Sequence, residues 1–425
     1  MNLNEDGRPR PWIAESWATA PDGLSLTVQI RPQAKFHDGT PVTASVIVPR
    51  LQDILPKAMG SAFEDIDQIL ALSDTRLQFR LRRPSPLLIE ALETSIQKPG
   101  KDGPGTGPYM PTASASPLEL KANTDYYLGR PAIDRIVVTS YPSVRTAWAE
   151  LLRGSLDMLY EVNMDALDSL ESSNSVAVFS YARHYQYLIM FGSRAPVFKS
   201  PEIRRELNAV IDRDALVREG LNGHGIASSG PVPPRHWALG RDVRTLAFDA
   251  KLASNLERRH VRFTCLVPAD SVYERIALAV KRQLAAASVD MQVEEVTQDQ
   301  LIQAMKRNDF EALLVDSVSG PSLFRSYQRW HSGSPFDLQA IDSTLIDSAL
   351  DRIRHASSDD EYRSGVTAFQ QAIVDDPPAI FLAWGERARA VSRRFDVPAA
   401  EDSRDVLATL RLWRPKTDQR AANRN

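Results

Sequence analysis

The sequence predicts an α/β fold of the mixed α+β kind, divided into more than one domain. Residues 24–30 (LSLTVQI) and 77–82 (LQFRLR) alternate apolar and polar side chains, which is the pattern of half-buried strands. Residues 261–316 follow the order strand, helix, strand, helix, strand with short connections, which predicts parallel pairing and right-handed crossovers. Because 425 residues exceed one small core, we expect two or three domains.

The composition argues against several classes of protein. With 43% hydrophobic and 25% charged residues, the chain lies in the range of ordinary globular proteins. A formal net charge of -3 gives no electrostatic footprint for nucleic acid, so we expect no nucleic-acid partner. Cys265 is the only cysteine, which excludes an internal disulfide and a cysteine-based metal cluster, and its apolar context (VRFTCLV) predicts a buried side chain.

The first hundred residues predict a small α+β unit. Helices are expected over residues 43–55, where Pro49 should kink or shorten the helix, and over residues 86–97. Residues 98–109 (KPGKDGPGTGPY) are rich in glycine and proline and predict a loop or a domain boundary. A phosphate-binding loop is disfavoured there, because no Lys-Ser/Thr pair follows and Pro108 lacks an amide donor.

Capping residues place most of the later helices. A helix over residues 144–153 should end at Gly154, Ser200 and Asp212 should each begin a helix, and Ser271 with Glu274 has the spacing of a capping box. The other expected elements are strands over 135–141, 261–267, 291–296, 310–316 and 379–384, helices over 271–287, 299–308, 343–355 and 359–374, and a disordered tail over 416–425.

No pattern in the sequence predicts catalysis. The seven histidines occur in no metal-ligand spacing, and GIASSG (225–230) only resembles a nucleophile elbow. His37 and Asp38, in FHDGTPVTA (36–44), are adjacent, so their side chains point in different directions, and Asp38-Gly39 is a strong turn signal. We therefore interpret this segment as a turn that leads into a helix, and we expect no enzyme activity, no cofactor and no metal site.

Several segments resemble one family, the extracytoplasmic solute-binding proteins of peptide- and nickel-type ABC transporters (family 5). The matching segments, in the family's order, are IAESW (13–17), DGLSLTVQIR (22–31), KFHDGTPVTA (35–44), GTGPY (105–109), NTDYYLGRPAIDRIVV (123–138), RTAWAELLRGSLDM (145–158), FKSPEIRRELNAVIDRDAL (198–216) and SGPVPP (229–234). The resemblance implies a two-lobed periplasmic-binding-protein fold of type II with an extra small domain.

The resemblance also implies domain boundaries and a location. The small extra domain would span 1–104, a large-lobe segment 105–195, the second α/β lobe 196–385, a return to the large lobe 386–415, and a tail 416–425. The N-terminus (MNLNEDGRPRPW) lacks the basic and apolar regions of a signal peptide. Since family members carry a signal and a first lobe segment upstream, we expect an N-terminal truncation and a periplasmic location.

The loop after the third strand of 261–316 is the candidate ligand loop, because open sheets bind ligands beyond the carboxyl ends of their strands. Peptide binders of the family carry an aspartate there for the peptide amine, whereas this chain has Gly320 before Pro321. An unpaired buried amine costs several kcal/mol, so a free peptide N-terminus is a doubtful ligand. Our candidate ligand residues are Ser317, Ser319, Ser322, Arg325, Tyr327, Trp330 as an apolar platform, and Tyr109; Arg329 lies nearby.

The sequence therefore predicts a non-catalytic solute-binding protein of an ABC importer. Its two lobes would close by hinge motion on a small polar ligand, such as a peptide-like compound, an opine or a sugar, and the closed form would dock on a membrane permease. We expect a monomer. The alternative is a cytoplasmic ligand-sensing module with the same fold, and a hydrolase is a distant third possibility.

Overall fold

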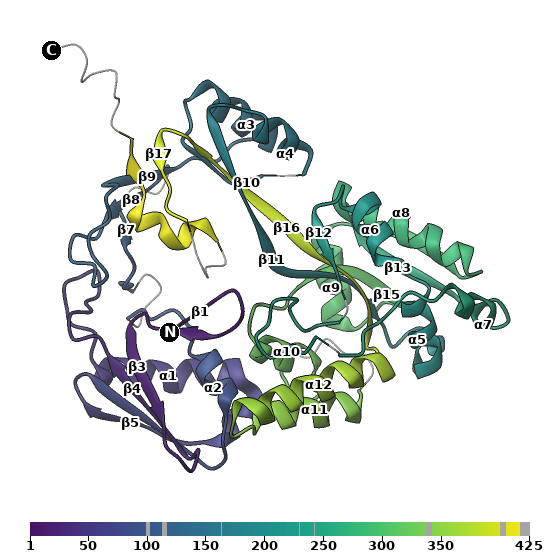
Figure 1. Cartoon of the computed structure of the whole chain (residues 1–425), viewed down its shortest axis with the longest axis horizontal. Coiled ribbons are helices and arrows are strands. Elements are labelled where there is room, and N and C mark those ends of the chain that lie inside the picture. The colour runs from purple at the N-terminus through teal and green to yellow at the C-terminus, as the bar shows by residue number, and fades with distance from the viewer. Residues whose placement is uncertain are drawn as a thin grey trace.

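The computed structural model describes residues 1–98, 103–112, 117–162, 164–228, 230–241, 243–336, 342–399 and 405–416. It confirms the mixed α/β class: helices cover a central sheet, and smaller sheets lie around it (Figure 1). The central sheet has the order β10 (Met158–Val162), β16 (Ala379–Ser392), β11 (Val176–Phe191), β15 (Ala312–Val318), β13 (Arg262–Pro268) and β14 (Asp290–Val296), with β12 (Gly225–Ala227) paired to β16.

The parallel part of this sheet forms as predicted. β13 pairs in parallel with both β14 and β15. The crossovers are α8 (Ser271–Ala286) and α9 (Gln298–Arg307). The capping box is misplaced in our prediction: Asp270 caps α8, whereas the box forms at α9 between Thr297 and Gln300. Cys265 is fully buried, as its apolar context predicts.

Two long antiparallel strands, β11 and β16, run side by side between β10 and the part of the sheet that contains β15 (Figure 1). Their pairing extends from Val176↔Ser392 to Met190↔Ala379. It is interrupted between Ala182↔Glu386 and Gln186↔Trp384, where three residues of β11 face the single Gly385. We predicted a strand over 379–384; the structure continues it to Ser392 because β10 and β11 both supply pairing partners.

The N-terminal region forms its own antiparallel sheet under a helix. The sheet order is β3 (Ala14–Thr19), β4 (Ser25–Ile30), β6 (Arg76–Leu81) and β5 (Ile66–Ser73), and the other elements are β1 (Asn2–Leu3), β2 (Pro9–Arg10), α1 (Ala44–Met59), η1 (Gly60–Asp65) and α2 (Pro86–Ala91). α1 is longer than predicted: it continues through Pro49 and Pro56 because Ile47, Leu51 and Leu55 bury its inner face. α2 is shorter than predicted and ends at Ala91.

The remaining elements surround the central sheet. They are β7 (Tyr109–Pro111), β8 (Leu118–Ala122), β9 (Arg135–Val138), α3 (Val144–Arg153), α4 (Met164–Glu171), η2 (Pro196–Lys199), α5 (Pro201–Ala209), α6 (Arg213–Gly220), η3 (Ala250–Leu252), α7 (Ala253–Glu257), α10 (Leu323–Trp330), α11 (Thr344–Arg354), α12 (Asp359–Asp375), β17 (Phe395–Asp396), η4 (Val406–Leu412) and β18 (Arg414–Pro415). The predicted caps at Ser200 and Asp212 and the left-handed end at Gly154 are confirmed. Residues 417–425, most of the predicted tail, lie outside the described residues.

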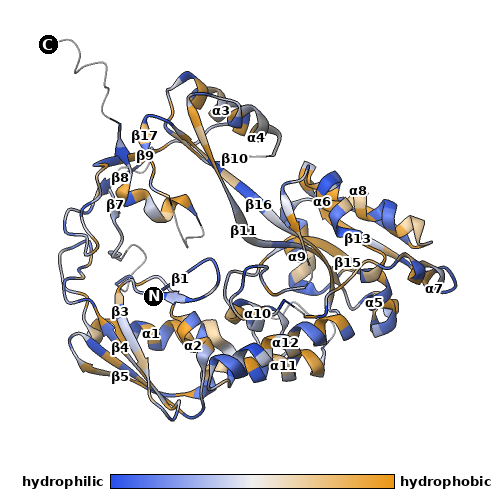
Figure 2. Cartoon of the chain, viewed as in Figure 1, coloured by the Kyte–Doolittle hydropathy of each residue, from blue (hydrophilic) through white to orange (hydrophobic). Residues whose placement is uncertain are grey.

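One hydrophobic core joins the N-terminal sheet to helices far along the chain. Phe79 and Leu55 belong to the same buried cluster as Phe324 of α10 and Phe369 of α12. A second cluster fills the opposite face of the central sheet, under α5, α6 and α8. Figure 2 shows the hydrophobic residues on the inner strands and hydrophilic ones on the outer sides of the helices. The domain boundaries inferred from the resemblance stay a prediction, because this core is continuous across the first of them.

Buried ion pairs reinforce that junction. Asp65, at the end of η1, is fully buried and accepts two hydrogen bonds from the Arg354 guanidinium of α11, at 2.6 and 2.9 Å. Arg83 at 2.9 Å and His355 at 3.4 Å also approach it. Burial alone would raise the pKa of Asp65, but the hydrogen bonds from His355 and Arg354 outweigh it and lower that pKa.

We predict that Asp65→Asn lowers the free energy of unfolding by about 3–5 kcal/mol, because it removes the buried charge that pairs with Arg354 and leaves this guanidinium only the more distant Asp351 carboxylate, at 3.6 Å. Since the folded pKa of Asp65 lies below its ordinary value of 3.8, the pair stabilises the chain above pH 3.8 and loses this effect as the pH falls through the folded value. Urea unfolding across this pH range measures both effects. The control is Asp67→Asn, at an exposed ion pair with Arg82, which should cost less than about 1 kcal/mol; equal losses in the two variants would contradict the prediction.

Candidate ligand site at the carboxyl edge of the central sheet

The carboxyl ends of β13 and β15 form a topological switch point. The chain leaves β13 into α8, whose Ile276 and Val280 join the core on one face of the sheet. It leaves β15 into α10, whose Leu323 and Phe324 join the core on the other face. Adjacent parallel strands with exits to opposite faces leave a crevice between their ends, and open α/β sheets bind ligands there.

The strand pairing shows where this crevice opens. β13 and β15 are paired only at Cys265↔Ala312 and Leu266↔Leu313. Beyond that point β13 stays with β14 as far as Pro268↔Val296, whereas β15 stays with β11 as far as Val318↔Tyr185. The two strands therefore separate toward their carboxyl ends. Because the last pairs of β15 lie beside the interruption in β11, the crevice sits next to the β11–β16 junction.

A cavity of about 210 Å³ occupies the crevice. Its lining residues come from β13, α8, α9, β15 and α10, and they are Pro268, Tyr273, Gln298, Leu301, Met305, Val315, Asp316, Ser317 and Arg329. Ser317, one of our predicted ligand residues, is 4% exposed, and its hydroxyl has no hydrogen-bond partner among the described residues. A buried serine without a side-chain partner among the described residues thus borders a cavity with both polar and apolar lining residues.

Two charged groups share this cavity. Arg329, which our prediction placed only nearby, makes no hydrogen bond or ion pair with any described residue, and its pKa is lowered by burial and by the charge of Arg325. Asp316 is hydrogen-bonded to the Tyr273 hydroxyl, and burial, together with the Asp316 charge, raises the pKa of Tyr273. We did not predict Tyr273 as a site residue. Its position in the first turn of α8, directly after the carboxyl end of β13, would have indicated that it lies near the ligand crevice.

The other serines of the ligand loop lie deeper. Ser319 and Ser322 are 2% and 3% exposed. Ser322 lies beside the buried Glu90, whose carboxylate accepts hydrogen bonds from Tyr362 at 2.5 Å and from the Phe324 amide at 2.8 Å. Burial raises the pKa of Glu90. Neither serine lines the cavity, so the contact of Ser319 and Ser322 with ligand stays a prediction. Ser322 instead contacts the Glu90 carboxylate inside the protein.

The aromatic residues of α10 are core residues in this structure. Trp330 is 1% exposed and packs edge-on against Phe381, with ring centroids 5.5 Å apart. Tyr327 is fully buried, and its hydroxyl bonds to Ser61 and Arg354, both at 3.0 Å. The proposed platform face of Trp330 is therefore covered by protein, because all four apolar or aromatic residues of α10, Leu323, Phe324, Tyr327 and Trp330, join the core. Arg325 is exposed and donates to Gln328 at 3.1 Å.

Tyr109 belongs to a different part of the molecule. It begins β7, its hydroxyl is buried without a partner among the described residues, and burial raises its pKa to about 12. The preceding GTG segment is held by the FHDG turn: His37 bonds through its amide to the Gly105 carbonyl at 2.8 Å and through its ring to that of Gly107 at 3.0 Å. Asp38 pairs with Lys98. His37 and Asp38 thus anchor the connection, as a turn interpretation requires.

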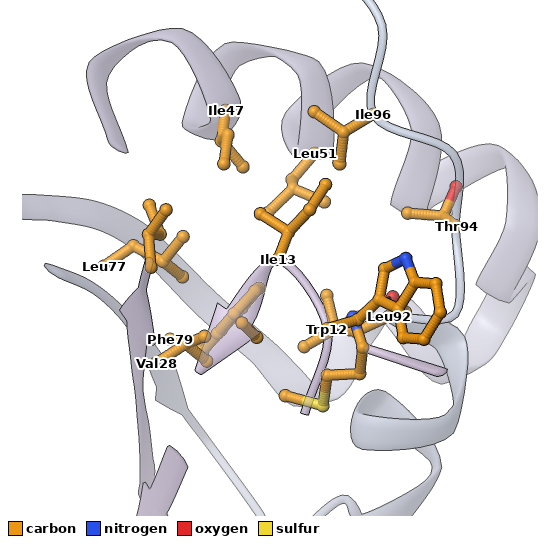
Figure 3. A pocket seen from close by; sticks show the side chains of 13 residues that line it. Trp12, Ile13, Val28, Ile47, Leu51, Leu77, Phe79, Leu92, Thr94 and Ile96 are labelled. Atoms are coloured by element: carbon orange, nitrogen blue, oxygen red, sulfur yellow. The ribbon is translucent and has the colours of Figure 1, made fainter. Parts of the chain in front are cut away.

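Two other cavities differ in character. One, of about 70 Å³, lies inside the N-terminal unit among Trp12, Ile13, Leu51 and Phe79, and almost all of its lining is apolar (Figure 3). Another, of about 310 Å³, lies between this unit and α12. Its cation, Arg8, stacks 3.5 Å over Trp237 and pairs with Asp359 at 2.7 Å. The described residues contain no cluster of three or more metal-ligating side chains.

Comparison with known proteins identifies the family. The model of the bacterial extracellular solute-binding proteins, family 5, matches residues 8–336. The chain belongs to this family. Within the described ranges, this family 5 protein has no helix long and apolar enough to span a membrane.

Individual relatives agree with this assignment. The probable D,D-dipeptide-binding periplasmic protein DdpA of Escherichia coli is 24% identical over 407 residues, which cover 87% of this chain and 78% of DdpA. The oligopeptide-binding protein AppA of Bacillus subtilis is 23% identical, with 95% and 83% covered. The solved structure of NikZ from Campylobacter jejuni with Ni(L-His) matches with a TM-score of 0.83 at 19% identity, covering 98% of this chain and 92% of NikZ. The two-lobed type II fold of our prediction is thereby confirmed, and the chain is a solute-binding protein of the ABC-importer type.

The backbone at Gly320 gives a prediction for the ligand loop. Gly320 has φ +54°, and a Cβ there would lie 3.1 Å from the Arg325 Cγ. We expect Gly320→Ala to cost about 1–2 kcal/mol in the free energy of unfolding and to reduce the amount of co-purified solute, because the loop must shift. The control, Gly154→Ala, has the same left-handed conformation but open space around it, so it should lose stability alone. Equal solute loss in both variants would contradict a role for this loop in binding.

Proposed function

We propose that this protein captures a small polar solute at the crevice between β13 and β15 and delivers it to the permease of an ABC importer in the periplasmic space. The observation that carries the proposal is the cavity at the switch point, lined by Ser317 and Arg329, whose side chains have no partner among the residues that the structure describes. The names of the relatives support it, since they describe proteins that bind dipeptides, oligopeptides and a nickel–histidine complex.

We propose that the hinge for closure of the two lobes is the point where the pairing of β11 with β16 is interrupted. Gly385 faces three residues of β11 there, and a Cβ on Gly385 would lie 3.0 Å from the Tyr187 ring. On one side of the interruption, residues 379–384 of β16 pair with the part of β11 that also pairs with β15. On the other side, residues 388–391 of β16 pair with β10. Arg387, two residues beyond, pairs with Glu161 of β10 at 3.0 Å. A closing motion would bend the two strands at this point, where the ladder has fewest hydrogen bonds.

The ligand we propose does not depend on a free peptide amine. Gly320 supplies no carboxylate at the loop position where we expected one in peptide binders. Asp316 offers a carboxylate in the neighbouring cavity, but the Tyr273 hydroxyl already donates to it. We propose that the protein acts as a monomer and has no catalytic role.

The test is native mass spectrometry of the protein expressed from its full coding region and purified from the periplasmic fraction. We expect a non-covalent solute that is released unaltered on denaturation and that has no free peptide amine. Ordinary oligopeptides in its place would contradict our interpretation of Gly320. A cytoplasmic location, together with no in-frame signal peptide in the DNA upstream of Met1, would contradict export and favour the ligand-sensing alternative.

A further inference from the structure

The ligand loop, residues 319–322, leads from β15 into α10 without supplying a cap for that helix. α8 and α9 also follow strands of the central sheet, and each is capped by the side chain just before it, Asp270 or Thr297. Ser322 has the same position before α10, but its side chain makes no capping hydrogen bond. The first amides of a buried helix need an acceptor. α10 must therefore obtain one from another part of the chain.

Glu90 of the N-terminal unit supplies this acceptor. One oxygen of its buried carboxyl group accepts a hydrogen bond from the Phe324 amide at 2.8 Å, and the Leu323 amide also lies beside this group. The other oxygen accepts from the Tyr362 hydroxyl of α12 at 2.5 Å. A carboxylate at the N-terminus of a helix also interacts favourably with the helix dipole. Glu90, in α2, thus caps α10 and is itself held by α12.

Gly7 makes a second contact between the N-terminal unit and the ligand loop. Its φ is +89°, and a Cβ at this position would overlap the Pro321 carbonyl oxygen. Only a glycine allows the backbone to approach the loop this closely in this conformation. Gly7 and Glu90 come from separate elements and contact separate residues of the loop and α10, which makes the two observations independent.

Glu90 does not line the candidate ligand cavity. That cavity is bordered by Ser317 of β15 and Arg329 of α10, the two elements that the ligand loop connects. Glu90 and Tyr362 instead line the cavity of about 310 Å³ between the N-terminal unit and α12. An effect of Glu90 on solute binding must therefore pass through the loop and α10.

We propose that the N-terminal unit positions the ligand loop for solute binding, with Glu90 as the positioning residue that caps α10 and Gly7 as the support of Pro321. This inference rests on the proposed function, because it assigns a role in the capture of solute. The donors to Glu90 are a hydroxyl and a backbone amide, which are neutral, so the position of its oxygens is required and its charge is not. The N-terminal unit contributes to recognition in this way without contacting the solute through Glu90.

The first experiment measures hydrogen–deuterium exchange of the peptide that covers residues 319–324 in the solute-free protein. We expect Glu90→Ala to speed exchange there at least about fivefold, because a buried amide that loses its acceptor is destabilised by that amount or more. Glu90→Gln should stay within about twofold of the wild type, since its side-chain oxygen can accept from the Phe324 amide. The control is Asp359→Asn, which alters the exposed Arg8–Asp359 pair between the N-terminal unit and α12 without touching the loop, and its exchange at 319–324 should not change.

A pair of glycine variants tests the same positioning without altering a buried carboxyl group, so the test still decides if Glu90→Ala does not fold. Gly7→Ala and Gly39→Ala replace glycines with similar φ, +89° and +83°, but at Gly39 no atom of another residue lies within 4 Å of the added Cβ. We expect faster exchange at 319–324 for Gly7→Ala alone. Exchange that is unchanged in Glu90→Ala and Gly7→Ala, or that rises equally in the two controls, would contradict the inference.

The second experiment compares the solute that co-purifies with each full-length variant, measured by native mass spectrometry. We expect Glu90→Ala and Gly7→Ala to retain less than about a fifth of the wild-type amount, and Glu90→Gln and the two controls to retain at least about half. Wild-type retention by Glu90→Ala despite faster exchange in the loop would overturn the positioning role and leave the solute-binding function intact. A wild-type protein that retains no solute would contradict the proposed function, whereas the exchange rates would still decide whether the N-terminal unit holds the loop.

Discussion

The paired strands β11 and β16 are the constraint on which the rest of this structure depends. They are the two longest strands, and their ladder joins β10 on one side to the parallel strands on the other. The ladder breaks opposite Gly385, where a Cβ would lie only 3.0 Å from the Tyr187 ring. Because β15 pairs with β11 as far as Tyr185, the same break fixes the position of the candidate ligand cavity.

Buried polar contacts decide which parts of the molecule move together. Asp65 and Glu90 both lie in the N-terminal unit and both accept hydrogen bonds from helices α10–α12. Asp65 accepts from Arg354. Glu90 accepts from the Tyr362 hydroxyl and from the Phe324 amide. The hydrophobic core is continuous across the same junction. In this conformation the N-terminal unit and α10–α12 therefore form one packed body, and its rearrangement would expose charges that the interior now compensates.

The ligand loop shows the limit of sequence reasoning about sites. Ser317, Arg325, Tyr327 and Trp330 are equally polar or aromatic in the sequence, but α10 turns Tyr327 and Trp330 into the core and leaves Arg325 in solvent. Arg329 lies one residue before Trp330 and faces the cavity instead. The amphipathic period of a helix does not say which polar residues meet a cavity, because that depends on where β13 and β15 separate.

The sequence by itself determined the class, the family, the parallel strand order and most helix caps. Alternating patterns, capping residues and motifs such as FHDGTP are local, so their physical causes lie within a few residues. Only the tertiary structure decided that α1 continues through two prolines, that Trp330 is buried and that Arg329 has no side-chain partner among the described residues. Those outcomes depend on contacts between separate elements of the fold, such as Trp330 with Phe381, where burial and pairing outweigh local preference.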